Sequence, residues 1–425
     1  MHKTISGRLV MPGDKSISHR AAMFAAIANG ATEITNFATS VDCASTLSCL
    51  SALGVKIERD GSTVSITGAG KSGFKAPPAP LDCGNSGTTM RLLAGILAGQ
   101  QFQSVLTGDE SLQKRPMKRV IAPMTQMGAS IGSQDGRAPL VINGDPLAGI
   151  QYTPPVASAQ IKSCVLLAGL FASGKTSVIE AVPTRDHTER MLAWFGAPLD
   201  ESESGNGKRL TIDGTKQFTA KNFRVPGDVS SSAFFMVAAA CLPGSNLELA
   251  GVGLNPSRTA VIHALKNLGA KVEIRNERIE CNEPVGDIVV IGGLEHSANE
   301  NIIRGGVIAN LIDEIPILAV FGTQLAGGLE VRDAAELRVK ESDRIAAVVE
   351  NLKRMGGRVT EFEDGFKIER SELHGATIDS FGDHRIAMAF GVAGLFAEAN
   401  TEILDAECAG VSFPGFFETL VSVTT

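Results

Sequence analysis

LVMPGDKSISHRAAMFAA, residues 9–26, returns in altered form as FRVPGDVSSSAFFMVAA at residues 223–239. Both stretches turn at Pro-Gly-Asp, place serines two residues apart and continue as an apolar, alanine-rich run with helical spacing. A long repeated pattern of this kind indicates repeated structure. We therefore expect two halves of the chain with the same architecture.

Apolar helical segments of this type recur six times in all. They open at residues 14, 84, 158, 228, 311 and 383, at intervals of 70 to 83 residues. Each is followed by an alternating run that predicts a strand, in most units by a second helix with a glycine suited to a left-handed C-cap, and usually by another strand. The repeats predict an α/β fold of two domains with three helix-strand units each.

The two Pro-Gly-Asp turns, near Pro12 and Pro226, are where we expect the chain to pass between these domains. One domain is then 13–226, and the other combines 1–12 with 227–425. We expect a double hinge at these turns and the active site in the interdomain cleft.

Composition excludes several classes of protein. Hydrophobic residues make up 44% of the 425 residues and charged residues 20%, which is typical of a globular chain rather than a disordered one. The scarcity of aromatic residues, with one Trp and one Tyr, argues against base-stacking platforms for nucleic acid, and we expect no nucleic-acid partner. Because the net charge is −7, any anion must be bound by a local cluster of cations. No apolar run reaches the ~18 residues of a membrane span, so we expect no membrane partner and a cytoplasmic location. The seven cysteines lack CxxC spacing and predict buried thiols, with no metal site.

Polar and cationic residues gather where the apolar helices begin. A helix N-terminus presents unpaired N–H groups and a partial positive charge, so several of them facing one place would bind anions. Helix capping alone explains any single Ser or Asn, but not Lys15 and Arg20 in an otherwise apolar helix. The residues at these openings are Lys15, Ser16, Ser18, Arg20, Asn85, Gly87, Thr88, Arg91, Ser158 and Gln160.

Three charged segments have both an ordinary and a functional interpretation. Residues 112–119, LQKRPMKR, are either a solvated basic turn or an anion site. Residues 336–344, ELRVKESDR, are either a salt-bridged helix face or part of a site. Capping explains one of the adjacent carboxylates Asp313 and Glu314 before an apolar helix, though not obviously both.

A fourth motif fits a phosphate-binding loop by letters only. Residues 169–176, GLFASGKT, match G-x-x-x-x-G-K-T, but that loop must follow a strand and open a helix. Here an apolar helical segment precedes it and a strand-like run follows. We expect no phosphate-loop function.

Taken together, eleven motifs resemble the 5-enolpyruvylshikimate-3-phosphate synthase family, in order and along essentially the whole chain, and are closer to its class II branch. The resemblance implies two inside-out α/β domains and transfer of the enolpyruvyl group of phosphoenolpyruvate to the 5-hydroxyl of shikimate 3-phosphate, with no cofactor. The motifs are PGDKSISHR, LDCGNSGTTMR, LQKRPM, ASAQIKS, TRDHTERML, VPGDVSSSAF, NPSRT, IDEIPILA, ELRVKESDR, DHRIAMAF and SFPGFFETL.

The resemblance also implies site residues, motif by motif. Those expected to bind shikimate 3-phosphate are Lys15, Ser16, Arg20, Ser158, Gln160, Arg185, Asp313 and Lys340. Those expected to bind phosphoenolpyruvate are Lys15, Gly87, Arg115, Gln160, Arg344 and Arg385. Arginine forks pair with carboxylate and phosphate, whereas lysine acts as a point charge.

Three catalytic roles follow. Addition requires a proton at C3 of the enol while the 5-hydroxyl loses its proton, and elimination reverses the C3 transfer and expels phosphate. We assign Asp313 to the 5-hydroxyl and Glu341 to C3, with Lys15 bridging the proton traffic.

Four positions depart from the class I pattern, namely Leu92, Ala159, His187 and Val411. The family is the target of glyphosate, which competes with phosphoenolpyruvate, and tolerant class II members have alanine where this chain has Gly87. We therefore expect measurable inhibition by glyphosate.

Two other functions are weighed against this one. The related UDP-N-acetylglucosamine enolpyruvyl transferases use a loop cysteine, and no cysteine lies between Cys83 and Cys164. A noncatalytic binding protein for phosphorylated metabolites would not need the carboxylates Asp313 and Glu341. We expect a monomeric enzyme whose partners are small anionic substrates.

Overall fold

The computed structural model describes residues 3–205, 207–215, 217–295 and 300–425. The chain divides into two compact units. The N-terminal unit comprises Gly13–Val225 with the short segment Glu280–Glu283, and the C-terminal unit comprises the residues through Pro12 with Pro226–Ile279 and Pro284–Thr425.

The segment Glu280–Glu283 departs from the expected boundaries, which had placed it with 227–425. It groups with the N-terminal unit because its side chains and backbone bind there: Glu283 Oε1 lies 2.8 Å from His187 Nδ1, and the Asn282 carbonyl accepts a hydrogen bond of 2.9 Å from Arg190. Sequence patterning missed it because these partners lie more than 90 residues away.

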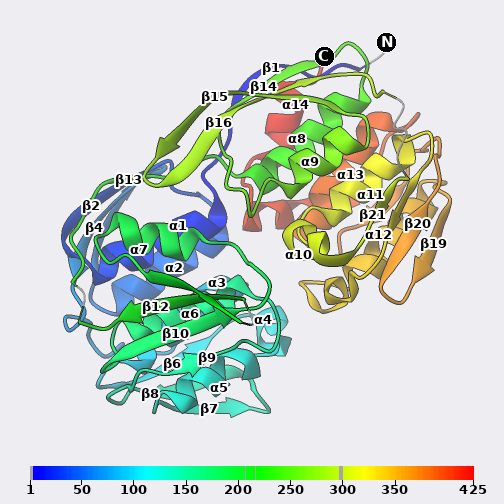
Figure 1. Cartoon of the computed structure of the whole chain (residues 1–425). Helices are drawn as coiled ribbons and strands as arrows, with labels where there is room; N and C mark the ends of the chain where they lie inside the picture. The colour runs from blue at the N-terminus through cyan, green and yellow to red at the C-terminus, as the bar shows by residue number, and fades with distance from the viewer. Residues whose placement is uncertain (1–2, 206, 216, 296–299) are drawn as a thin grey trace. The chain divides into compact units, whose positions relative to one another are not determined.

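The six repeats are present in the structure, three per unit (Figure 1). In the N-terminal unit the helices are α1 (Lys15–Ile27), α2 (Val41–Ala52), α3 (Gly87–Ala98), α4 (Glu110–Lys114), α5 (Lys118–Gln126), α6 (Ala159–Gly169) and α7 (His187–Trp194). The strands are β2 (Asn29–Thr35), β3 (Lys56–Asp60), β4 (Thr63–Ala69), β5 (Leu81–Asp82), β6 (Gln103–Thr107), β7 (Ser130–Gln134), β8 (Arg137–Asn143), β9 (Gln151–Tyr152), β10 (Lys175–Glu180), β11 (Asp200–Ser204), β12 (Gly207–Asp213) and β13 (Phe223–Arg224).

The C-terminal unit repeats this plan. Its helices are α8 (Val229–Cys241), α9 (Ala260–Asn267), α10 (Ile308–Leu311), α11 (Ile315–Gln324), α12 (Arg344–Arg354), α13 (His384–Phe396) and α14 (Phe416–Ser422), with 3-10 turns at Gly305–Val307, Ala335–Val339 and Ala406–Val411. Its strands are β1 (Ser6–Val10), β14 (Asn246–Gly253), β15 (Lys271–Glu280), β16 (Glu283–Ile291), β17 (Ile302–Ile303), β18 (Leu329–Val331), β19 (Val359–Phe362), β20 (Gly365–Ile368), β21 (Thr377–Asp379) and β22 (Glu402–Leu404).

Five sheets share one topology. A short edge strand pairs in parallel with the strand that follows the long helix, and this strand pairs antiparallel with a two-stranded hairpin. The strand orders are β13-β2-β4-β3, β5-β6-β8-β7, β9-β10-β12-β11, β1-β14-β16-β15 and β17-β18-β20-β19, and the last repeat keeps only β21-β22. The sequence had predicted one strand where the structure has a two-stranded hairpin.

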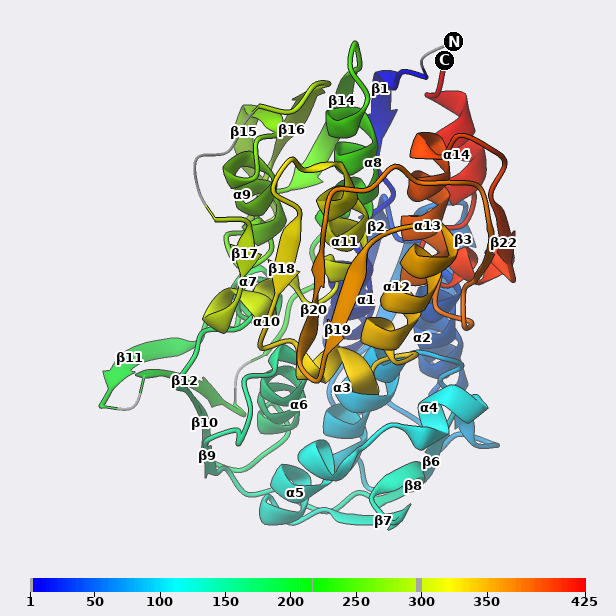
Figure 2. The same cartoon turned by 90° about the vertical axis from the view of Figure 1, so that its right-hand side faces the viewer.

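Each unit is inside-out, as expected. In the N-terminal unit α1, α3 and α6 are buried on nearly all sides, and the sheets lie around them (Figure 1). In the C-terminal unit α8, α11 and α13 have the same place, with β14–β16 and β19–β20 outside them (Figure 2). Such helices are apolar on all faces because each face contacts another element. The strands alternate between buried and exposed residues because one face of each sheet meets the helices.

Glycines end the second helix of five repeats in a left-handed conformation, which confirms the C-cap prediction. A residue with a Cβ is strained at positive φ, whereas glycine is not. The φ values are 88° at Gly54, 110° at Gly128, 92° at Gly196, 97° at Gly269 and 80° at Gly356.

Residues 169–176 connect the end of α6 to the start of β10. A phosphate-binding loop has the opposite polarity, from strand to helix. The prediction that GLFASGKT has no phosphate-loop function is consistent with this geometry.

Candidate active site

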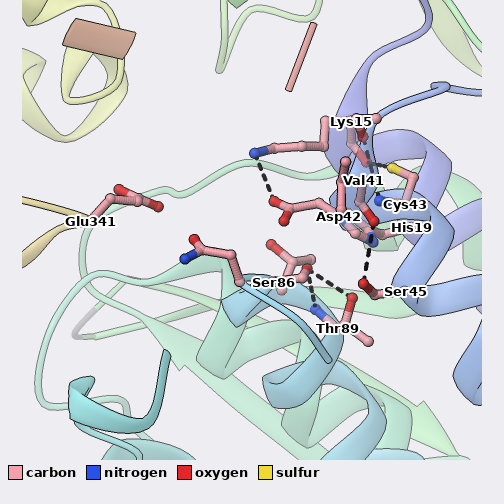
Figure 3. Close-up of polar contacts among 12 residues, drawn as sticks. Lys15, His19, Val41, Asp42, Cys43, Ser45, Ser86, Thr89 and Glu341 are labelled. Atoms are coloured by element: carbon pink, nitrogen blue, oxygen red, sulfur yellow. Dashed lines mark hydrogen bonds and ion pairs between the residues drawn. The ribbon is translucent and has the colours of Figure 1, made fainter. Parts of the chain in front are cut away.

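The openings of the long helices are capped by their own side chains. The hydroxyl of Ser86 accepts a hydrogen bond of 3.1 Å from Thr89 N (Figure 3), and that of Ser158 accepts one of 3.4 Å from Ile161 N. Asp14 caps α1 in the same way. Capping therefore accounts for one lone pair of Ser158, a residue also expected at the substrate site.

Lys15 is held by a carboxylate that the sequence analysis did not single out. Its Nζ lies 3.0 Å from Asp42 Oδ2, in the first turn of α2 (Figure 3). Lys15 and Ser16 open α1, and the Ser16 carbonyl accepts a hydrogen bond of 3.0 Å from Arg20. The ion pair fixes the ammonium at the start of this helix.

Arg20 is buried and held by neutral oxygens. Its Nε donates to Thr188 and its NH2 to Ser163, both at 2.8 Å, and these two hydroxyls lie 2.7 Å apart. Burial lowers the pKa of Arg20 to about 10, and the nearby carboxylate of Glu189 opposes this shift. Ser163 and Thr188 were missed because their contacts with Arg20 span 143 and 168 residues of sequence.

A second cationic group surrounds the start of α3. Gln160 accepts a hydrogen bond of 2.6 Å from Arg91 NH1 and donates one of 3.0 Å to Thr88. A Cβ on Gly87 would lie 3.1 Å from Arg91 NH1 and 3.5 Å from Arg115 NH1. Both guanidinium groups therefore reach the space above Gly87.

Arg115 is positioned by the loop that precedes α3. Its NH2 donates to Asn85 Oδ1 at 2.7 Å and to Ser111 at 3.2 Å, and Asn85 in turn donates to Asp109 at 2.8 Å. The basic segment 112–119 is therefore not simply a solvated turn, since Arg115 is buried.

Behind the loop that carries Arg185 lies a buried ionic network that the sequence analysis missed. The Nζ of Lys162 lies 2.6 Å from Glu189 and 3.0 Å from Glu180. Glu180 also accepts hydrogen bonds from the backbone N–H and the hydroxyl of Thr184, at 3.2 and 2.5 Å. Burial raises the pKa of Glu189, and Lys162 opposes this shift. The network fixes both ends of the Arg185 loop.

In the C-terminal unit, Arg344 joins three carboxylates. It lies 2.8 Å from Asp383, 2.7 Å from Glu341 and 3.5 Å from Asp313. Burial alone lowers its pKa, but Asp383 and Glu341 outweigh burial and hold the pKa above the ordinary value. Residues 336–344 are thus salt-bridged at Arg344 and Glu341, but Glu341 precedes α12, so the pair does not form the helix face that was expected, and it does not exclude a site.

Asp313 faces three arginines. Arg344 lies 3.5 Å from its carboxylate, and Arg385 and Arg258 each lie 3.9 Å away. Arg385 NH1 also donates to the Asp313 carbonyl at 2.8 Å and to Ser230 at 3.0 Å. Arg258 lies in the NPSRT segment but was not chosen as a site residue from the sequence.

Lys340 is partly buried beside the same carboxylates. Burial lowers its pKa, although Asp313 and Glu336 oppose the shift. Its Nζ lies 3.8 Å from Glu336 Oε1.

The expected site residues thus form two groups. The structure places Lys15, Ser16, Arg20, Gly87, Arg115, Ser158, Gln160 and Arg185 in the N-terminal unit, and Asp313, Lys340, Glu341, Arg344 and Arg385 in the C-terminal unit. Of the class I departures, Leu92 is buried in α3, Ala159 begins α6, His187 is buried against Glu283 and Val411 ends a 3-10 turn.

Three further features of the described ranges concern metals, thiols and membranes. No group of three or more His, Cys, Asp or Glu residues there has a geometry that could hold a metal ion. All seven cysteines are free thiols, of which Cys43, Cys49, Cys83 and Cys164 are buried. Within the same ranges no single helix is long and apolar enough to cross a membrane. One pair of helical segments, Gly305–Leu311 and Ile315–Gln324, has the length and composition of a membrane span when taken together, but it is bent by 109°.

Comparison with known proteins agrees along the whole chain. The family model described as EPSP synthase (3-phosphoshikimate 1-carboxyvinyltransferase) matches residues 1–420. The 3-phosphoshikimate 1-carboxyvinyltransferases of Salinibacter ruber and Pelotomaculum thermopropionicum are 49% and 51% identical; each alignment covers 99% of this chain, and 97% and 96% of the relatives. A solved EPSP synthase from Acinetobacter baumannii is 43% identical with a TM-score of 0.87, covering 100% of this chain and 98% of that one. The chain therefore belongs to the EPSP synthase family.

Proposed function

We propose that this protein transfers the enolpyruvyl group of phosphoenolpyruvate to the 5-hydroxyl of shikimate 3-phosphate, giving 5-enolpyruvylshikimate 3-phosphate and phosphate. The observation that carries the proposal is the pair of carboxylates on one buried guanidinium: Glu341 at 2.7 Å and Asp313 at 3.5 Å from Arg344. The reaction needs two carboxylates with different tasks, and a metabolite-binding protein needs neither.

In this proposal, shikimate 3-phosphate is bound mainly by the N-terminal unit. Arg20 is suited to bind an anion because its hydrogen bonds to protein go to neutral oxygens, which do not neutralise its positive charge. Arg forks and serine hydroxyls provide the directional contacts that a phosphate group requires. The proposed ligands are Lys15, Ser16, Arg20, Ser158, Gln160, Arg185, Asp313 and Lys340.

The proposed ligands of phosphoenolpyruvate are mostly arginines. Two of them, Arg344 and Arg385, lie beside Asp313. A third, Arg115, reaches the space above Gly87, where the absence of a side chain leaves room for a ligand group. Lys15 and Gln160 complete the set together with Gly87.

The chemistry proceeds in two balanced steps. In addition, the 5-hydroxyl oxygen bonds to C2 of the enol and loses its proton to Asp313, while Glu341 delivers a proton to C3. In elimination, C3 returns a proton to Glu341, the C2=C3 double bond reforms, and the C2–O bond to phosphate breaks, with the departing phosphate taking up the proton that Asp313 had accepted. Lys15 stabilises the phosphate and the hydroxyl during both steps, and preorganised charges lower the barrier.

The proposal also includes a cellular location and an oligomeric state. We propose a cytoplasmic enzyme that acts as a monomer on small anionic substrates. Size-exclusion chromatography with light scattering tests the second point, since a dimer would double the mass of 44.5 kDa.

The test of the function is phosphate release. Purified protein with phosphoenolpyruvate is assayed with shikimate 3-phosphate and, separately, with UDP-N-acetylglucosamine. We expect release only with the shikimate ester. Release with the nucleotide sugar would favour the related transferase, and binding without release would favour a metabolite-binding protein.

A further inference from the structure

Glu314 is a buried carboxylate that the proposed mechanism does not use. It directly follows Asp313, is 1% exposed, and stands at the N-cap of α11 without a side-chain capping bond. Its Oε1 instead accepts a hydrogen bond from the hydroxyl of Ser230, the second residue of α8. A buried charged group requires a polar partner, and here that partner comes from another helix.

The same hydroxyl contacts an arginine of the proposed site. Arg385 NH1 donates to Ser230 Oγ at 3.0 Å and to the Asp313 carbonyl at 2.8 Å. A serine hydroxyl has one proton and two lone pairs. Because Glu314 takes the proton, the lone pairs of Ser230 are directed toward the guanidinium.

This arrangement has a defined polarity. An ionised carboxylate only accepts hydrogen bonds and an arginine only donates them, so the hydroxyl between them has a single favourable orientation. Without Glu314 the hydroxyl proton could turn toward Arg385, where it would meet a cation, and NH1 would lose one of its two acceptors.

We infer that Glu314 is a positioning residue for phosphoenolpyruvate, which acts through Ser230 to fix the orientation of the Arg385 guanidinium. The inference rests on the proposed role of Arg385 in binding phosphoenolpyruvate. It assigns Glu314 no contact with substrate.

The test compares four variants of the full chain by steady-state kinetics. Glu314→Met keeps volume but removes the acceptor, and Ser230→Ala removes the link. We expect each to raise KM for phosphoenolpyruvate about 5- to 20-fold, in the range of one lost hydrogen bond to a charged group. The double variant should be no worse than either single one, because both substitutions break the same connection. Glu314→Gln restores an acceptor oxygen and should recover KM to within about threefold.

The dissociation constant for shikimate 3-phosphate, measured by calorimetry, should stay within about twofold in all four variants, which separates positioning from a general loss of structure. Ser231→Ala, one residue further along α8, is the matched control and should leave KM unchanged, since its backbone bond to Asp228 survives. If Glu314→Met does not fold, Ser230→Ala alone decides. An unchanged KM in Ser230→Ala, multiplicative losses in the double variant, or equal losses for both substrates would each overturn the inference.

Arg385→Lys distinguishes this inference from the function on which it rests. If that variant binds phosphoenolpyruvate normally, the proposed role of Arg385 is wrong. If Arg385→Lys weakens phosphoenolpyruvate binding and the Glu314 and Ser230 variants do not, only the positioning role is wrong.

Discussion

Substitution of Gly87 by alanine should weaken ligands that use the space above α3 without harming the fold. Gly87 is the first residue of α3, and its φ is not among the left-handed ones. Alanine in a helix is favoured over glycine by about 0.5–1 kcal/mol, so the melting temperature should stay constant or rise. Any loss of activity can then be assigned to the site.

The size of the effect follows from the contacts of the added methyl group. Its carbon would lie 3.1 Å from Arg91 NH1, whereas an ordinary contact is about 3.5 Å or more, so the guanidinium must move by about 0.4 Å. That movement also disturbs the 2.6 Å bond from Arg91 to Gln160. A displacement of ~1 Å in an active site can lower activity by ~100-fold. For the smaller movement here we expect about a tenfold rise in KM for phosphoenolpyruvate, which corresponds to ~1.4 kcal/mol of binding free energy.

The assay measures KM for phosphoenolpyruvate and Ki for glyphosate in wild type and Gly87→Ala. Glyphosate is the longer ligand, so its Ki should rise by a larger factor than KM. Gly174→Ala is not a suitable control, because that glycine has a positive φ of 82°; Gly410→Ala, with no atom within 4 Å of the new Cβ, is suitable. If KM for phosphoenolpyruvate and Ki for glyphosate are the same in wild type and Gly87→Ala, the steric reasoning is refuted. Leu92, which lies on α3 behind Gly87, is then the first residue to test.

Four further outcomes are expected. Asp313→Asn should lower kcat by ~10² to 10⁴ if Asp313 takes the proton of the 5-hydroxyl, whereas a change confined to KM would make it a binding residue. Glu341→Gln should suppress solvent deuterium exchange at C3 of phosphoenolpyruvate while leaving shikimate 3-phosphate binding intact; exchange at the wild-type rate would remove Glu341 from the proton path. Lys162→Met leaves two buried carboxylates without their cation and should lower the free energy of unfolding by ~3–5 kcal/mol. The measurement is the midpoint of urea unfolding, and an unchanged midpoint would show that the network does not stabilise the protein. Burial lowers the pKa of Lys340, so the ammonium loses its proton as the pH rises, at a pH lower than the ordinary pKa of 10.5, and KM for shikimate 3-phosphate should increase over that range. Lys340→Arg should remove this alkaline increase in KM, and the same increase in both proteins would assign it to another group.

The repeated architecture could be predicted from sequence because its signals are local. Helical spacing, alternation and a glycine at the helix end each lie within one segment, and the left-handed φ of Gly54 and Gly356 shows how closely they determine the backbone. The hairpins were predicted less well. In β3 and β4 two strands of five and seven residues are joined by a two-residue turn, and short polar strands of this kind do not separate by periodicity.

The side chains of the candidate site were predicted by type, but their partners were not. Asp42 pairs with Lys15 across 27 residues, and Glu283 meets His187 across 96. Such pairs form only when segments that are distant in the sequence pack together, so no local pattern contains them. Arg258 could have been suspected, because it is the single cation in NPSRT, a segment of small and polar residues.

The partners of a buried cation indicate whether its charge is available to a substrate. Lys162 and Ser163 are neighbours on α6, yet their networks differ in this respect. Lys162 faces two carboxylates, which compensate its charge, so it stabilises the loop of Arg185 rather than binding an anion. Ser163 instead holds Arg20 through a neutral hydroxyl, and the other hydrogen bonds of Arg20 go to Thr188 and a carbonyl. Neutral partners fix the direction of the guanidinium but leave its positive charge in a buried place, which is unfavourable until an anion arrives. Arg20 is therefore the stronger candidate to bind the phosphate of shikimate 3-phosphate, although the protein as a whole carries a net charge of −7.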